Sequence, residues 1–213
     1  MPPTAVAVAV GVLLAVALLG PAFDRRSVAI VAAAAAFPDV DALFVLVGPG
    51  GPNAVFHSLF IPVVAVAALY YDTRSRETSW LASNYGWYGV RVAWVTVAAY
   101  AVAGIGLDLF STDGVALLYP LSDRYYAIIG GFLLSTHEGV IQTYVTWDNG
   151  WFEVASPGTV DQNVVESPLS PAANGHRVRI VETGWQAVIV LTALASLPAK
   201  RLVEAADRDG GDE

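Results

Sequence analysis

The sequence predicts an all-α fold, a multi-span integral membrane helical bundle with about five spans and a short polar extramembrane loop. Composition is the first observation: the 213-residue chain is 55% hydrophobic and only 14% charged, whereas soluble domains carry about 25% charged residues. The second is a series of long runs almost free of ionisable side chains. The third is the position of the basic residues next to the ends of these runs, as on the cytoplasmic side of membrane helices.

Charge and cysteine content exclude several functions. The formal net charge is −8, so a nucleic-acid backbone is repelled and no nucleic-acid partner is expected. Cysteine is absent, which excludes disulfides, a thiolate nucleophile and a cysteine-based zinc site. Lys200 is the one lysine among 11 basic residues. This acid-rich, arginine-over-lysine composition is typical of proteins from salt-loving archaea.

The first predicted span covers residues 5–23, which are uncharged. A secretory signal peptide has the same hydrophobicity, but it carries a positively charged start and a small-residue cleavage site. No basic residue precedes this run, and Gly20-Pro21-Ala22 is a poor cleavage site. We therefore interpret the run as a retained membrane span.

Two further spans are predicted on either side of a turn. Residues 27–47 are apolar except for Asp39 and Asp41, and residues 48–53 are a glycine- and proline-rich turn. Residues 55–71 form the third apolar run, with His57 as the ionisable side chain in its interior.

The fourth and last predicted spans are residues 88–110 and 183–199. Between them, residues 126–147 are apolar but interrupted by two glycines and by His137-Glu138, so we expect a re-entrant or interfacial segment. Lys200 and Arg201 then lie on the cytoplasmic side with the other basic clusters. A six-span alternative places these two residues on the opposite side.

The predicted domain organisation has four parts. Residues 1–147 form the membrane helical domain, 148–178 a polar extramembrane loop or flap, 179–203 the final span, and 204–213 a disordered acidic tail. An aromatic belt at the membrane interfaces accounts for most Trp and Tyr residues, including Tyr85, Tyr88 and Tyr125. The expected location is the cell membrane, as a multi-pass protein with the lipid bilayer as its partner.

Ionisable groups inside apolar spans are costly, at about 2.5–3.5 kcal/mol each at mid-helix, and they mark function by default. Asp39 and Asp41 lie toward the outer end of the second span, and His57 lies near the start of the third. Asp108 lies at the outer end of the fourth span. Because consecutive spans alternate in direction, all four residues are predicted to converge near one membrane face.

Three carboxylates and one imidazole favour a divalent cation such as Mg²⁺, Mn²⁺ or Zn²⁺. Asp39 and Asp41 do not share a face of a regular helix, but Pro38 predicts an irregular backbone that can aim both at one ion. The alternative is that they cap a broken helix or bind backbone in a turn. We predict Asp39, Asp41, His57 and Asp108 as metal ligands and catalytic residues.

Three sequence blocks carry a resemblance to a known family. They are residues 37–41 (Phe-Pro-Asp-Val-Asp), 57–59 (His-Ser-Leu) and 108–120 (Asp-Leu-Phe-Ser-Thr-Asp-Gly-Val-Ala-Leu-Leu-Tyr-Pro). In order and spacing they are similar to the blocks of the YdjM-like family, membrane-bound, metal-dependent hydrolases that are also described as LexA-binding and inner-membrane-associated. The resemblance covers roughly residues 30–125.

The resemblance also has two departures. The first histidine of the family's second block falls on Pro52, and the histidine four residues before the third block falls on Gly104. A site that lacks both imidazoles holds a harder metal, holds no metal, or recruits a replacement ligand. His137 and Glu138 are the candidates for that replacement in the apolar part of the chain.

The leading functional hypothesis is therefore a membrane-bound metal-dependent hydrolase. The resemblance implies water activated by a divalent metal attacking a phosphoester or acyl bond, with one carboxylate taking the proton. A site at the membrane boundary indicates a membrane-associated, lipid-linked substrate. One alternative is a non-catalytic membrane binding or scaffold protein descended from that family. A second is a small transporter that uses Asp39 and Asp41 within a span.

Overall fold

The computed structural model describes residues 3–41, 53–111, 113–128, 132–135, 139–142, 154–155, 159, 181 and 183–209. The chain divides into two compact units. The helical unit comprises Pro2–Pro38, Ile61–Gly104 and Asn174–Glu213, and the second unit comprises Asp39–Phe60 and Ile105–Ala173.

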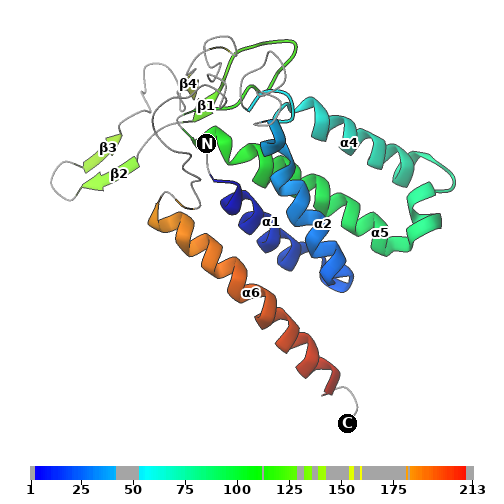
Figure 1. Ribbon diagram of the computed structural model, residues 1–213. Helices are drawn as coiled ribbons and strands as arrows, with labels where there is room; N and C mark the ends of the chain where they lie inside the picture. The colour runs from blue at the N-terminus through cyan, green and yellow to red at the C-terminus, as the bar shows by residue number, and fades with distance from the viewer. Residues whose placement is uncertain are drawn as a thin grey trace, which may run out of the picture. The chain divides into compact units, whose positions relative to one another are not determined.

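The helical unit is built from α-helices joined by short turns. The α-helices are α1 (Thr4–Leu18), α2 (Arg25–Ala36), α4 (Phe60–Tyr70), α5 (Trp80–Ala99) and α6 (Gly184–Asp209). The connecting elements are η1 (Gly20–Ala22), η3 (Tyr71–Ser75) and, after α5, the π-helical η4 (Tyr100–Gly106). Helix α1 packs against α2, α5 and α6, and α2 also packs against α5 (Figure 1).

Small residues let the central helices approach closely. A Cβ on Gly11 of α1 would lie 2.6 Å from the Cβ of Ala35 on α2, so this crossing tolerates only glycine. Ala15, Val31 and Val95 bring α1, α2 and α5 together in one buried core. Such small-residue contacts are how helices associate where no water drives their apolar faces together.

One end of the helical unit gathers basic residues. Arg91 of α5 donates from Nε to the carbonyl oxygen of Leu18 at 2.8 Å, which caps the C-terminal end of α1. Lys200 of α6 donates to the carbonyl oxygen of Val16 and stacks over the ring of Phe23. We call this the cationic end. Lys200 and Arg91 thus both bind backbone oxygens at the C-terminal end of α1.

Helix lengths correct the predicted number of spans. Among the described residues, Trp80–Phe110 and Gly184–Ala206 are long and apolar enough to cross a membrane. Helices α1, α2 and α4 have 15, 12 and 11 residues, and at about 1.5 Å per residue they are shorter than the roughly 30 Å hydrocarbon core. About five full-length spans are therefore not seen in the described part of the chain, which is mostly helical and has two candidate spans.

The second unit contains short strands that the all-α prediction did not include. They are β1 (Ala127–Ile128), β2 (Phe132–Ser135), β3 (Gly139–Gln142) and β4 (Val154–Ala155). Strand β1 pairs antiparallel with β4, and β2 pairs antiparallel with β3, with Phe132 opposite Gln142. Three of these strands lie in residues 126–147, where a re-entrant or interfacial segment was expected. Gly130 and Gly131 disfavour a continuous helix there.

The C-terminal boundaries also differ from the prediction. Helix α6 continues to Asp209, six residues beyond the predicted end of the last span, because residues 202–207 are good helix formers and Pro198 is accommodated within the helix. Residues 210–213 of the predicted tail lie outside the described residues. So do the turn at 48–52 and most of the predicted flap at 148–178, in which β4 and Thr159 are described.

Candidate metal centre

Asp39 and Asp41 are placed by the end of α2. The α-helix stops at Ala36 and tightens into the 3₁₀ turn η2 (Phe37–Val40), which agrees with the irregular backbone predicted from Pro38. The side chain of Asp39 is 13% exposed, and that of Asp41 is 1% exposed. Both carboxylates therefore leave a tight turn in largely buried surroundings.

His57 lies on a loop before α4 rather than within the first turn of that helix, as was expected. The loop is bound to the segment that follows Asp108. The backbone N–H of Ala116 donates to the oxygen of Asn53 at 3.0 Å, and that of Leu59 donates to Leu117 at 2.9 Å. The side chain of Asn53 adds a bond to the oxygen of Gly114 at 3.1 Å. The long third sequence block thus holds the His57 loop in place.

The hydroxyl of Ser58 has a structural partner. It donates to the backbone oxygen of Tyr119 at 2.7 Å and accepts from the backbone N–H of Phe60. Ser58 is 3% exposed. These contacts support a structural role beside His57 and give no sign of a nucleophile.

Asp108 enters the site from the end of α5. The π-helical turns of η4 precede it, and the short 3₁₀ helix η5 (Asp108–Phe110) begins with it. π-Helical turns are rare and occur frequently at functional sites. The side chain of Asp108 is 5% exposed.

The imidazole of His57 is the centre of the site, with no exposed surface. Its Nδ1 lies 2.9 Å from Oδ2 of Asp41. Its Nε2 lies 2.8 Å from Oδ2 of Asp108 and 3.7 Å from Oδ1 of Asp39. The structure therefore brings together all four residues that the sequence singled out.

Asp41 differs from the other two carboxylates in its hydrogen bonds. Its Oδ1 and Oδ2 accept the backbone N–H of Phe56 at 2.9 and 3.1 Å, and Oδ2 also accepts Nδ1–H of His57. In the neutral imidazole this contact places the proton on Nδ1 and leaves a lone pair on Nε2. A carboxylate behind a histidine is the usual support of a metal-binding imidazole.

The other side of the imidazole is rich in acceptors and poor in donors. Within the described residues, Nε2 of His57 and Oδ2 of Asp39 are buried and make no hydrogen bond. The Nε2–Asp108 approach of 2.8 Å lacks hydrogen-bond geometry. In the neutral ring, a lone pair facing carboxylate oxygens at this distance is repulsive, and either a bound cation or a proton on Nε2 removes the repulsion.

These atoms fit a divalent metal ion. One donor atom from each of Asp39, His57 and Asp108 lies within 4.8 Å of the others, and all three side chains are buried or nearly so. Two carboxylates and one imidazole form a mixed oxygen and nitrogen set that suits Zn²⁺, Mn²⁺ or Mg²⁺.

The missing histidine at position 104 has a steric explanation. A Cβ on Gly104 would lie 2.7 Å from Cγ of Pro38 and 3.1 Å from the backbone oxygen of Ala35. The helical unit therefore has no room for a side chain at this position. Pro52 and the replacement candidates His137 and Glu138 lie outside the described residues.

Tyr125 is a residue near the site that sequence reasoning placed elsewhere. It was assigned to the interfacial aromatic belt, yet it is 1% exposed and packs with Ala54 and Ala116. Burial and, next, the charge of Asp41 raise the pKa of Tyr125 to about 12. No sequence signal distinguishes this tyrosine from Tyr126 beside it.

Comparison with known proteins gives one assignment. No curated protein and no solved structure matches the chain significantly. The sequence model of one family, described as the YdjM inner membrane protein, matches residues 1–196 and so covers the candidate metal centre and most of the helical unit. The chain therefore belongs to the YdjM family of inner membrane proteins.

Proposed function

We propose that this protein is a multi-pass membrane hydrolase whose divalent metal ion is held by Asp39, His57 and Asp108. The observation that carries the proposal is the buried group of two carboxylates and Nε2 of His57, whose donor atoms lie within 4.8 Å of one another. The sequence predicted Asp41 as a fourth ligand. Its two oxygens are instead engaged by Phe56 and His57, so we assign Asp41 to positioning the imidazole.

The proposed role of each residue in the reaction follows from its surroundings. A divalent ion supplies Lewis acidity, which acidifies water and polarises a phosphoryl or acyl oxygen. Asp39 is the most exposed of the three carboxylates, so water and substrate reach the site beside it. Oδ2 of Asp39 has no hydrogen-bond donor among the described residues and is suited to take a proton.

The substrate class follows from the setting. The family is one of inner membrane proteins, and Asp108 lies near the end of the candidate span Trp80–Phe110. A phosphoester or acyl bond of a membrane-associated, lipid-linked substrate is the expected target. An adjacent carboxylate pair inside a span was the basis of the transporter alternative. Only Asp39 of that pair faces the acceptor group.

The decisive experiment measures metal content in the full chain purified in detergent. Wild type is compared with Asp39→Ala and Asp108→Ala, and Asp123→Ala is the control that removes a carboxylate elsewhere. We expect about one equivalent of divalent metal in wild type and the control, and a loss of more than 90% in the two site variants. Hydrolysis of p-nitrophenyl phosphate and acyl esters in mixed micelles is then tested with the same four proteins.

Two results would overturn parts of the proposal. Absence of metal from wild type, with all variants equally stable, would contradict the metal centre. Stoichiometric metal without hydrolysis of either ester class would favour the scaffold alternative, to which the closed position at Gly104 already lends support.

A further inference from the structure

Helix α4 is apolar on every side and is largely unpacked. Its sequence from Phe60 to Tyr70 has no charged residue, and Pro62 is its one buried residue. Val63, Val64 and Val66 are 59%, 66% and 41% exposed. A helix of this kind is stable where hydrocarbon, rather than water, covers it.

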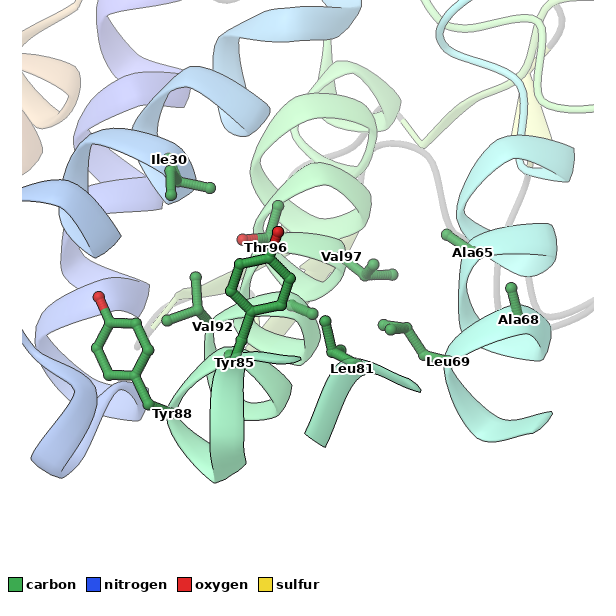
Figure 2. A pocket seen from close by; sticks show the side chains of 12 residues that line it. Ile30, Ala65, Ala68, Leu69, Leu81, Tyr85, Tyr88, Val92, Thr96 and Val97 are labelled. Carbon is green, nitrogen blue, oxygen red and sulfur yellow. The ribbon is translucent and has the colours of Figure 1, made fainter. Parts of the chain in front are cut away.

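A groove separates α4 from α5. Its volume is about 540 Å³, within the range of about 300–1,000 Å³ that is usual for small-molecule sites. Figure 2 shows Ala65, Ala68 and Leu69 of α4 on one side and Val92 and Val97 of α5 on the other. No charged residue lines the groove. Its occupant must therefore be almost entirely hydrocarbon.

Glycines in α5 shape one end of this groove. Gly86 has a φ of +64°, which kinks the helix and turns Tyr85 back along it. A Cβ on Gly89 would lie 2.3 Å from the Cβ of Tyr85, so the close approach of Tyr85 requires glycine. Tyr85 and Tyr88 line this end and give it the amphipathic character of a membrane–water interface.

The turn between the two helices carries a positive charge. The turn η3 joins α4 to α5 and contains Arg74, which is exposed and has no ion-pair partner within the described residues. Its neighbour Arg76 is paired with Asp72 at 3.2 Å. An apolar groove that ends at tyrosines and a free guanidinium matches a lipid with a hydrocarbon chain and an anionic head group.

We propose that the groove between α4 and α5 binds one hydrocarbon chain of an anionic membrane lipid, with the head group at η3. The groove is continuous with the exposed apolar face of α4, so a lipid enters it from the bilayer without crossing a polar surface. A helix from a second copy of this chain is the competing occupant. The exposed apolar face of α4 beside the groove favours lipid over that occupant. This proposal goes beyond the hydrolase proposal and does not depend on it.

Native mass spectrometry of the full chain in detergent tests this proposal. The probes are phosphatidylglycerol and phosphatidylcholine with identical acyl chains. We expect wild type to retain one phosphatidylglycerol and to prefer it over phosphatidylcholine by about fivefold, since one arginine contributes about 1 kcal/mol near an anionic head group.

Two neighbouring alanines provide a matched pair of variants. Ala68 lines the groove and Ala67 does not, and both are exposed on α4. Ala68→Phe fills the groove and should reduce retention of both lipids by about tenfold. Ala67→Phe should leave retention unchanged. Arg74→Gln should abolish the preference for phosphatidylglycerol while retaining lipid, and Arg124→Gln is its charge-matched control.

Two results would contradict the lipid proposal, and each has a different meaning. Equal retention in Ala68→Phe and Ala67→Phe would show that lipid binds nonspecifically around the helices. A dimer in wild type that Ala68→Phe dissociates would identify a second copy as the occupant. Metal content is measured in every variant and should not change, so failure of this proposal is distinguishable from failure of the metal centre.

Discussion

Aspartates serve two different purposes in the buried centre around His57 and in the exposed turn at Asp72. Asp72 accepts hydrogen bonds from the hydroxyl of Ser79 at 2.7 Å, from the backbone N–H groups of Trp80 and Leu81 at 2.9 and 3.0 Å, and from Arg76. In the buried centre, Oδ2 of Asp39 has no donor among the described residues. A carboxylate surrounded by donors holds its own turn together, whereas carboxylates gathered around an imidazole are placed to share a bound cation.

The largest expected effect comes from removing the imidazole of His57, which tests the contrast between the buried centre and the turn at Asp72. His57→Asn eliminates Nε2 and leaves Asp39 and Asp108 close together without a shared nitrogen. We expect metal affinity to fall by more than about 100-fold, because loss of a direct ligand exceeds the effect of losing its support. Competition with a chelator measures this change. Asp72→Asn should leave the affinity unchanged, and an equal effect of the two variants would contradict the distinction between the regions.

Asp41→Asn sharpens the comparison within the buried centre. Its amide keeps the shape of the carboxylate but weakens the support of Nδ1–H of His57. We expect metal affinity to fall by about 10–100-fold while one equivalent still binds at saturation. If this variant instead loses metal as completely as His57→Asn, Asp41 is a direct ligand, as the sequence suggested.

Gly104→Ala tests whether the lost histidine position is closed. The new Cβ would meet Pro38 at 2.7 Å, and such overpacking costs about 1–3 kcal/mol. Gly184→Ala is the control, since nothing lies within 4 Å of a Cβ at that position. Thermal unfolding in detergent compares the two variants. Equal midpoints would show that Pro38 moves aside and that the position is open to a ligand.

The smallest expected effect is a pH dependence at Asp72. The hydrogen bond from Ser79 and, next, that from the backbone of Leu81 lower the pKa of Asp72 from 3.8 to about 2. Because the folded pKa lies below the unfolded one, the stabilisation is complete above about pH 4 and disappears as the pH falls toward 2. The midpoint difference between wild type and Asp72→Asn should narrow over this window. If the difference in unfolding midpoint between the two proteins does not change with pH, the lowered pKa of Asp72 is contradicted.

The sequence was sufficient to predict which residues meet. Asp39, His57 and Asp108 lie where apolar segments of alternating direction end, and that alternation is enough to bring them together. It could not separate the role of Asp41 from that of Asp39, because the difference lies in which backbone N–H group each carboxylate faces. Only the folded structure shows that the backbone N–H of Phe56 donates to the carboxylate of Asp41.

Other differences between the predicted and observed secondary structure arise from local backbone preferences that a hydropathy pattern does not contain. Apolar runs of span length do not predict where a helix tightens, as α2 does at Pro38, or where a glycine pair interrupts a helical pattern after Ile128. The crowding at Gly104 is likewise a property of packing, since glycine in a helix has many causes. Sequence reasoning thus predicted the cluster of Asp39, Asp41, His57 and Asp108 but overestimated the helical content around it.

The contact between Lys200 and Val16 has a consequence for biogenesis. These residues are 184 positions apart in the chain, so α1 leaves the ribosome long before the helix that covers it. Until α6 has been synthesised, Lys200 cannot bind the carbonyl oxygen of Val16 or pack over the ring of Phe23. Docking of the last helix onto the first is therefore a late assembly step, which follows synthesis of all the segments that carry the metal centre.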